Sequence, residues 1–140
     1  MSVSGSLSAF VNMAMLIDDN ETDNFIHSRI IEITTFAAKI EVKESAIKAL
    51  EFLQQNQDNH RNLPDIIFLD LNMPYMNGYD FLSHFEKLSD TVKNKCRICV
   101  LSSSDHEADI TRVKSNPFVS HYFTKPLSVQ SLEELKQTLR

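Results

Sequence analysis

The sequence predicts a doubly wound α/β domain, in which helices cover both faces of a five-stranded parallel sheet. Its 140 residues, 42% of them hydrophobic, suit one domain around one sizeable core. Five short apolar runs alternate with five helical patterns, which favours crossover connections between parallel strands. The first, third and fourth runs are continuously apolar, as expected for strands that helices bury on both sides.

The five apolar runs are the predicted strands. Each has the length and apolar content of a buried strand, and the second run is the most polar. They occupy residues 14–17 (AMLI), 37–42 (AAKIEV), 65–69 (DIIFL), 97–101 (RICVL) and 118–123 (FVSHYF).

The five helical patterns place apolar residues three or four positions apart, which is the spacing of one helical face. This periodicity assigns Phe25, Phe81 and Phe85 to the core. The fourth pattern is highly charged, and only Ile110 and Val113 are clearly apolar, so we expect that helix to dock loosely. The patterns occupy residues 20–33, 44–55, 79–88, 103–114 and 128–139.

Charge and hydropathy exclude several classes of protein. The net charge is −5 and the sequence contains no block of Lys and Arg, so we expect no direct contact with nucleic acid. No apolar run approaches the length of a membrane span, so we expect no membrane insertion. The start MSVSGSLSAF lacks the features of a signal peptide. We therefore expect a cytoplasmic protein with a flexible tail at residues 1–11 and a folded domain at 12–140.

Two cysteines, Cys96 and Cys99, form a CxxC pattern, which raises the question of a redox or zinc site. The pattern runs into a predicted strand, where residues three positions apart point to opposite faces. The sequence also contains no second CxxC or His pair that would complete a zinc site. We interpret both residues as structural thiols.

Polar residues follow four of the five predicted strands. Asp18 and Asp19 follow the first strand, Asp70 the third, Ser102 the fourth and Lys125 the fifth. The carboxyl ends of parallel strands meet at one edge of the sheet, so these side chains should gather there. Each residue alone has an ordinary explanation as a cap or a loop residue, but their joint occurrence favours a functional site.

The residue types indicate phosphoryl chemistry. Three adjacent carboxylates repel one another unless a cation neutralises them, and oxygen-only ligands suit Mg²⁺. Lys125 offers a positive charge for phosphate oxygens, and Ser102 offers a hydrogen-bond donor. A carboxylate beside Mg²⁺ and a lysine is a competent nucleophile toward phosphorus. We therefore predict that Asp70 accepts a phosphoryl group.

Four motifs, LIDDN, FLDLNMPYMNG, VLSSS and YFTKPL, together resemble those of the receiver domains of two-component response regulators. They occur in the order of that family, and the resemblance covers about residues 12–139. It implies a flavodoxin-like fold with strand order 2-1-3-4-5. It also implies a signalling module that catalyses only its own Mg²⁺-dependent phosphorylation and dephosphorylation and is otherwise not an enzyme.

The resemblance implies a role for each matching acid. Asp70 matches the phosphorylated aspartate. Asp19 matches the direct ligand of Mg²⁺ (or Mn²⁺), and Asp18 helps to hold the ion, partly through water. Asn72 would give its backbone carbonyl to the metal.

The resemblance also implies roles for the residues after the last two strands. Ser102 matches the switch hydroxyl, and Lys125 matches the phosphate-binding lysine, which a cis peptide usually joins to a proline, here Pro126. Tyr122, three residues before the lysine, falls at the position of the switch aromatic.

The resulting hypothesis is a stand-alone response regulator that takes a phosphoryl group from a histidine kinase or a histidine phosphotransfer protein. About fifteen residues follow Lys125, room for one helix, so we expect no output domain. The signal would leave through the helix near 105–115, the strand at 118–123 and the last helix, toward a partner protein or a second copy. A phosphorelay intermediate without conformational output remains an alternative.

The sequence supports two alternatives, an enzyme and a ligand-binding protein, less well than it supports a response regulator. A phosphatase of the haloacid-dehalogenase class needs a second Asp two residues after the nucleophile, where this sequence has Asn72. A nucleotide or flavin binder needs a glycine-rich loop, but the only glycines are Gly5 and Gly78.

Overall fold

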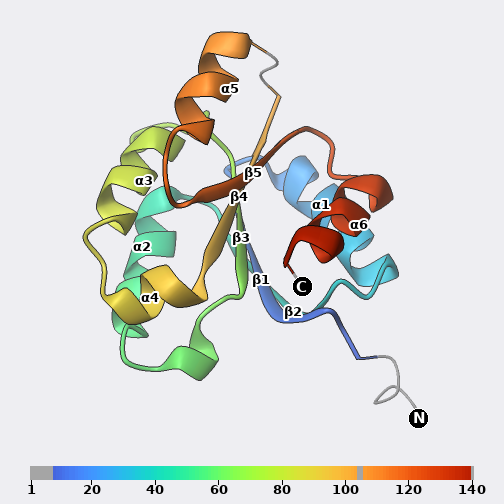
Figure 1. The fold of residues 1–140 in the computed structure, drawn as a ribbon, viewed down its shortest axis with the longest axis horizontal. Helices are drawn as coiled ribbons and strands as arrows, with labels where there is room; N and C mark the ends of the chain where they lie inside the picture. Colours follow the sequence, from blue (N-terminus) through green and yellow to red (C-terminus); the bar gives the residue numbers. More distant parts are fainter. Residues whose placement is uncertain (1–7, 104–105, 140) are drawn as a thin grey trace.

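The five apolar runs form one parallel sheet in the computed structural model, which describes residues 8–103 and 106–139. The strand order is β2-β1-β3-β4-β5, so both the doubly wound fold and the order implied by the resemblance are confirmed (Figure 1). The strands are β1 (Val11–Ile17), β2 (Ala37–Lys43), β3 (Ile66–Leu69), β4 (Arg97–Ser102) and β5 (Val119–Thr124).

Helices cover both faces of the sheet. In Figure 1, α1 and α6 lie on one side, while α2, α3 and α4 lie on the other. Val113 of α5 joins the same core cluster as α2 and α3, so α5 belongs to that second side. The helices are α1 (Glu21–Ile33), α2 (Ala46–Gln55), α3 (Gly78–Phe85), α4 (Asp90–Lys95), α5 (Glu107–Lys114) and α6 (Val129–Leu139).

Besides the five predicted helices, the described residues contain two further helical segments. These are α4 and a 3₁₀ turn, η1 (His60–Asn62). Helix α4 is too short to give a periodic pattern, because Val92 is its one buried residue. Its start carries a local signal, since the hydroxyl of Ser89 accepts a hydrogen bond from the Val92 amide at 3.4 Å.

The core assignment of Phe25 was wrong. Its side chain is 67% exposed, whereas Phe81 and Phe85 are fully buried as predicted. The buried face of α1 instead consists of Asn24, His27 and Ile31. Both stripes recur with helical spacing, so periodicity alone cannot choose between them. In this rotation the side-chain amide of Asn24 donates a hydrogen bond to the Asp18 carbonyl at 2.8 Å.

The sheet separates two hydrophobic clusters, and the two cysteines fall on opposite sides of it. Cys96 packs in the cluster beneath α2 and α3, and Cys99 packs in the cluster beneath α1 and α6. Burial raises the pKa of the Cys96 thiol to about 12 and that of Cys99 further still, so neither is poised as a thiolate. The divergence expected from strand geometry is confirmed.

Phe10 and Val11 are part of the packed structure. Strand β1 begins at Val11, and the ring of Phe10 packs against Phe36 with 5.7 Å between centroids. Residues 1–7 of the predicted tail lie outside the described residues. Among the helices that the structure describes, none combines the length and hydropathy needed to cross a bilayer.

Candidate functional site

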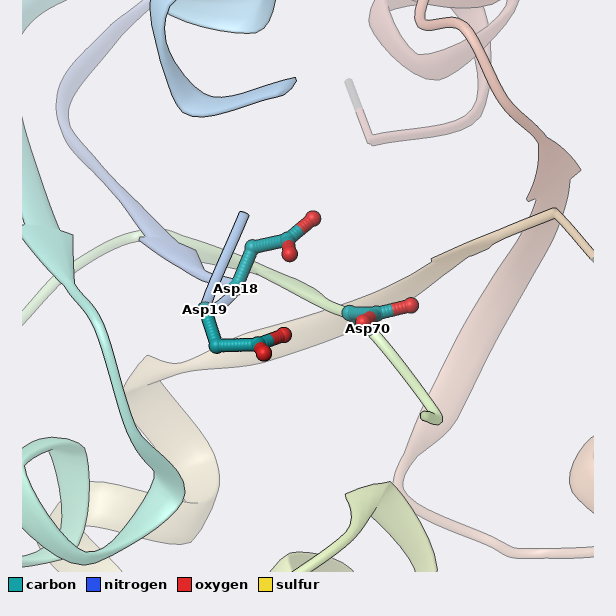
Figure 2. A group of neighbouring side chains, drawn as sticks. All are labelled: Asp18, Asp19 and Asp70. Carbon is teal, nitrogen blue, oxygen red and sulfur yellow. The ribbon is translucent and has the colours of Figure 1, made fainter. Parts of the chain in front are cut away.

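The predicted acids meet at the carboxyl ends of β1 and β3. One carboxylate oxygen from each of Asp18, Asp19 and Asp70 lies within 4.8 Å of the others (Figure 2). Asp18 and Asp70 are each only 5% exposed, whereas Asp19 is exposed to solvent. After β1 the chain crosses to β2, and after β3 it crosses to β4, which lies in the opposite direction along the sheet. The acids at the ends of β1 and β3 therefore lie where the direction of the strand order reverses.

Backbone hydrogen bonds at the ends of the strands hold these acids in place. The Asp70 amide donates to the carbonyl of Ile17 at 3.0 Å, and the Asp18 amide donates to that of Lys43 at 3.1 Å. The Asn20 amide then donates to the Asp18 carboxylate at 2.9 Å. The sheet itself therefore brings together side chains that lie some fifty residues apart in the sequence.

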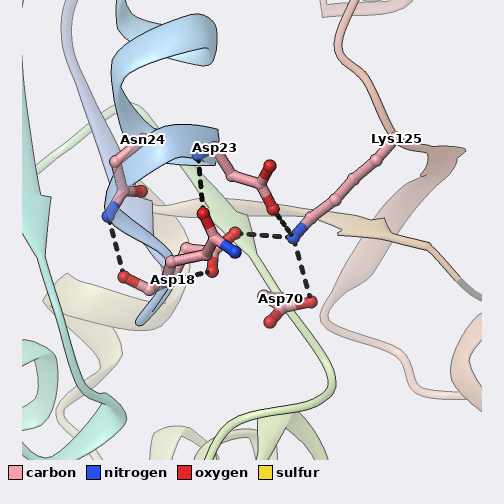
Figure 3. Close-up of polar contacts among 6 residues, drawn as sticks. Asp18, Asp23, Asn24, Asp70 and Lys125 are labelled. Atoms are coloured by element: carbon pink, nitrogen blue, oxygen red, sulfur yellow. Dashed lines mark hydrogen bonds and ion pairs between the residues drawn. The ribbon is translucent and has the colours of Figure 1, made fainter.

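Lys125 completes the group from the end of β5. Its amide donates to the Ser102 carbonyl at 2.8 Å, which ties the loop after β5 to the end of β4. Its ammonium lies 2.7 Å from a carboxylate oxygen of Asp18, 2.8 Å from one of Asp23 and 3.6 Å from one of Asp70 (Figure 3).

Asp23 was missed by the sequence analysis. It lies in the first turn of α1, where an acid is ordinarily read as a favourable partner of the helix dipole. Its backbone amide donates to the side chain of Asn20, the N-cap residue, while its carboxylate reaches Lys125. The sequence did contain a signal for Asp23, because it is an acid one helical turn after the Asp18-Asp19 pair.

The electrostatics of the site favour the binding of a cation. Burial, together with the nearby Asp18 carboxylate, raises the pKa of Asp70 to about 6, although Lys125 acts in the opposite direction. Burial disfavours the charged form of Lys125, but its hydrogen bonds to Asp18 and Asp23 outweigh this and raise its pKa. One ammonium therefore stands against four carboxylates, and a divalent ion would offset most of the remaining negative charge.

The acids line an open cleft of about 570 Å³. Its walls are rich in carboxylate, amide and hydroxyl oxygens, which fits a hard cation that keeps several waters. Asn72 lies at this cleft, and its backbone amide hydrogen-bonds to the Asp70 carboxylate. The lining residues are Asp18, Asp19, Asn20, Glu21, Thr22, Asp23, Asp70, Asn72, Ser103 and Lys125.

Neither of the two predicted switch residues, Ser102 and Tyr122, is among the residues that line the cleft. Ser102 is fully buried at the end of β4 and pairs with Thr124 of β5, while the next residue, Ser103, is exposed and lines the cleft. Tyr122 is half-buried on β5, opposite Val100, and packs against the core cluster beneath α2 and α3. The Lys125–Pro126 peptide is cis, as the resemblance implies.

Gly78 has a structural explanation and no phosphate-binding one. Its amide donates to the Leu71 carbonyl at 2.9 Å, and a Cβ at this position would lie 2.8 Å from the Asp70 carbonyl oxygen. The glycine therefore lets α3 start directly against the loop that carries Asp70.

The comparison with protein families identifies the chain. The model of the response regulator receiver domain matches residues 14–137, and the chain belongs to this family. The family is a signalling module of two-component systems. The predicted resemblance is thus confirmed over nearly the whole domain.

Individual relatives agree with this assignment. The chain is 31% identical over 125 residues to the probable methanogenesis regulatory protein FilR2 of Methanothrix harundinacea, covering 89% of this chain and 77% of that protein. It is 26% identical to the two-component response regulator ORR1 of Oryza sativa subsp. indica over 91% of this chain, but spans only 54% of ORR1. A crystal structure of a two component response regulator from Cytophaga hutchinsonii superimposes with a TM-score of 0.84 at 31% identity, covering 91% of this chain and 96% of that one.

Proposed function

We propose that the protein is a response regulator whose Asp70 accepts a phosphoryl group from a phosphohistidine of a histidine kinase or a phosphotransfer protein. The observation that carries the proposal is the position of Asp70: its buried carboxylate lines an open cleft, beside two further acids and 3.6 Å from the ammonium of Lys125. Neither a structural cap nor a surface ion pair requires this arrangement.

The chemistry follows from these contacts. A carboxylate oxygen of Asp70 attacks phosphorus, an acyl phosphate bond forms, and the bond to the donor imidazole breaks. With a pKa of about 6, Asp70 is mostly ionised at neutral pH, and its burial limits the hydration that would weaken it as a nucleophile. Lys125 offers its ammonium to the oxygens of the arriving group. No second acid is available two residues after Asp70, where Asn72 stands, so the phosphatase alternative lacks its general acid.

The donor set fits Mg²⁺ or Mn²⁺. Asp18, Asp19 and Asp70 would hold the ion through carboxylate oxygens, and Asn72 through its backbone carbonyl, with water in the remaining positions. The ion would neutralise charge that develops on the transferred group. The assignment of Asn72 rests on the resemblance and on its place at the cleft.

Output would pass from the site to the face formed by α5, β5 and α6. Ser102 would turn toward the phosphoryl group, and Tyr122 would respond in the neighbouring strand. Helix α5 buries only Val113, so a small free-energy change can displace it. We infer that this face binds a partner protein or a second copy of the chain. A relay intermediate would lack this response, and the cytoplasmic location stays a prediction.

The direct test is phosphorylation by a small donor. The full chain, incubated with acetyl phosphate and Mg²⁺, should gain one phosphoryl group that hydroxylamine removes. Asp70→Asn should gain none, whereas Asp58→Asn, which changes an exposed acid outside the cleft, should behave as the wild type. Equal labelling of Asp70→Asn and the wild type would refute the assignment.

A further inference from the structure

Asp23 contacts the lysine of the site as closely as Asp18 does. Lys125 Nζ is 2.8 Å from Asp23 and 2.7 Å from Asp18, but 3.6 Å from Asp70. An ammonium has three hydrogens to donate, and the two short contacts occupy two of them. The residue proposed to receive the phosphoryl group therefore has the weakest hold on Lys125.

The contact of Asp23 is specific to the tertiary structure. The two residues are 102 positions apart in the sequence, and the side chain of Lys125 is only 14% exposed. Asp23 itself is 31% exposed, so solvent reduces the strength of this pair but does not replace it. As the N-cap interaction of α1 uses the Asp23 amide, the carboxylate is not needed for that cap.

The two acids that hold Lys125 differ in what a bound cation would do to them. Asp18 belongs to the cluster of three carboxylates, so a divalent ion would draw on its oxygens and loosen its grip on Lys125. Asp23 is not a member of that cluster. It would keep its contact with Lys125 when the ion is bound, and it would then compete with the oxygens of a phosphoryl group for the same ammonium.

We propose that Asp23 is a positioning residue that holds Lys125 back from Asp70 and thereby slows phosphorylation of the protein. The inference rests on the proposed function of Asp70. It assigns to Asp23 the regulation of the same site, because the phosphoryl oxygens compete with Asp23 for the ammonium of Lys125.

The test compares initial rates of phosphorylation by acetyl phosphate at saturating Mg²⁺. Asp23→Asn, and Asp23→Ala, which removes both side-chain acceptor atoms, should both react about threefold faster or more, because a charge-assisted hydrogen bond no longer competes. Glu21→Gln is the matched control. Glu21 lines the same cleft, and no contact with Lys125 is found for it within the described residues. It should therefore change the rate by less than Asp23→Asn does.

A second readout avoids the chemical step. The affinity for beryllofluoride with Mg²⁺, followed by NMR of the backbone amides, should rise about threefold or more in Asp23→Asn. In a Lys125→Met background the same substitution should no longer change the affinity, because the shared partner is gone. A purely structural role of Asp23 would give the same effect in both backgrounds.

The outcomes separate the two proposals. If the wild type neither accepts the phosphoryl group nor binds beryllofluoride, the proposed function fails. If the wild type does both, the proposed function stands. The inference about Asp23 then fails if Asp23→Asn is phosphorylated no faster than the wild type, or only as fast as Glu21→Gln. It also fails if Asp23→Asn changes the affinity for beryllofluoride equally with and without Lys125.

Discussion

Gly78 lies directly against the backbone of Asp70. A Cβ added to Gly78 would lie 2.8 Å from the Asp70 carbonyl oxygen and 2.8 Å from the Cα of Leu71. Both of these are backbone atoms, so neither can move aside as the end of a flexible side chain would. The start of α3 and the loop that carries Asp70 thus form one packed unit.

Gly78→Ala should therefore destabilise the protein by about 2 kcal/mol or more, because the loop or the helix must shift to admit the methyl group. Ser83→Ala, at an exposed position of the same helix, is the control and should stay within about 0.5 kcal/mol of the wild type. Urea denaturation measures both. Equal stability of Gly78→Ala and Ser83→Ala would contradict the close approach.

Asp70 should make the metal-free protein less stable as pH rises. Its pKa is raised from 3.8 to about 6, so between these values the folded state keeps a proton that the unfolded state has released. The stability that the proton on Asp70 contributes is fully present below about pH 4 and is lost by about pH 6. The free energy of unfolding should fall by up to about 3 kcal/mol over this range.

The measurement is urea denaturation in EDTA from pH 4.5 to 7.5. The advantage of Asp70→Asn over the wild type should grow with pH and level off above about pH 6.5. Asp58→Asn, remote from the cleft, provides the charge-matched control. A stability difference that stays constant or shrinks as pH rises would show that burial of the Asp70 charge is not costly.

Relief of repulsion at Asp19 should stabilise the metal-free protein. Its oxygen lies within 4.8 Å of oxygens of Asp18 and Asp70, and Lys125 contacts those two acids and not Asp19. Asp19→Asn should raise the melting temperature by about 3 °C in EDTA and weaken Mg²⁺ binding. Glu51→Gln, an exposed acid of α2, is the control. A lower melting temperature with unchanged Mg²⁺ affinity would argue against an acidic metal site.

The contacts of Tyr79 on α3 with Asp109 and Arg112 on α5 should hold α5 against the domain. The Tyr79 hydroxyl donates to Asp109 at 3.3 Å, and the guanidinium of Arg112 lies 3.7 Å from the centre of the Tyr79 ring. Tyr79→Phe removes only the hydrogen bond and should cost about 0.5–1 kcal/mol, while Tyr79→Leu removes the ring as well and should cost more. Amide exchange should accelerate in α5 and stay unchanged in β1. Uniform acceleration of amide exchange across the domain would refute a local effect of Tyr79 on α5.

Ser102 should couple the site to the output face. Binding of beryllofluoride with Mg²⁺ should alter amide exchange in α5 and β5, and Ser102→Ala should abolish those distant changes while leaving the cleft responsive. Ser103→Ala is the control for register, because Ser103 lines the cleft whereas Ser102 is fully buried. Changes confined to the cleft in the wild type itself would favour a passive relay intermediate.

The sequence alone determined the fold class, the strand order through a family resemblance, and the set of residues at the strand ends. It could do so because strands buried on both faces are continuously apolar, and because parallel strands end at one edge of a sheet. The sequence therefore predicted that Asp18, Asp70 and Lys125 lie close together. Helix α4 could not be foreseen, since six residues around one buried valine leave no periodic signal.

Only the tertiary structure decided which face of α1 turns inward and which acids hold Lys125. Two stripes of α1 share the helical period. In the fold the stripe of Asn24, His27 and Ile31 is buried, with Asn24 donating to the Asp18 carbonyl, and Phe25 is left exposed. The same rotation carries Asp23 to Lys125. The sequence pattern shows where apolar residues recur, but the assembled sheet chooses among equivalent rotations, because Ile31 packs in the cluster beneath α1 and α6 and Asp23 meets Lys125, 102 positions away.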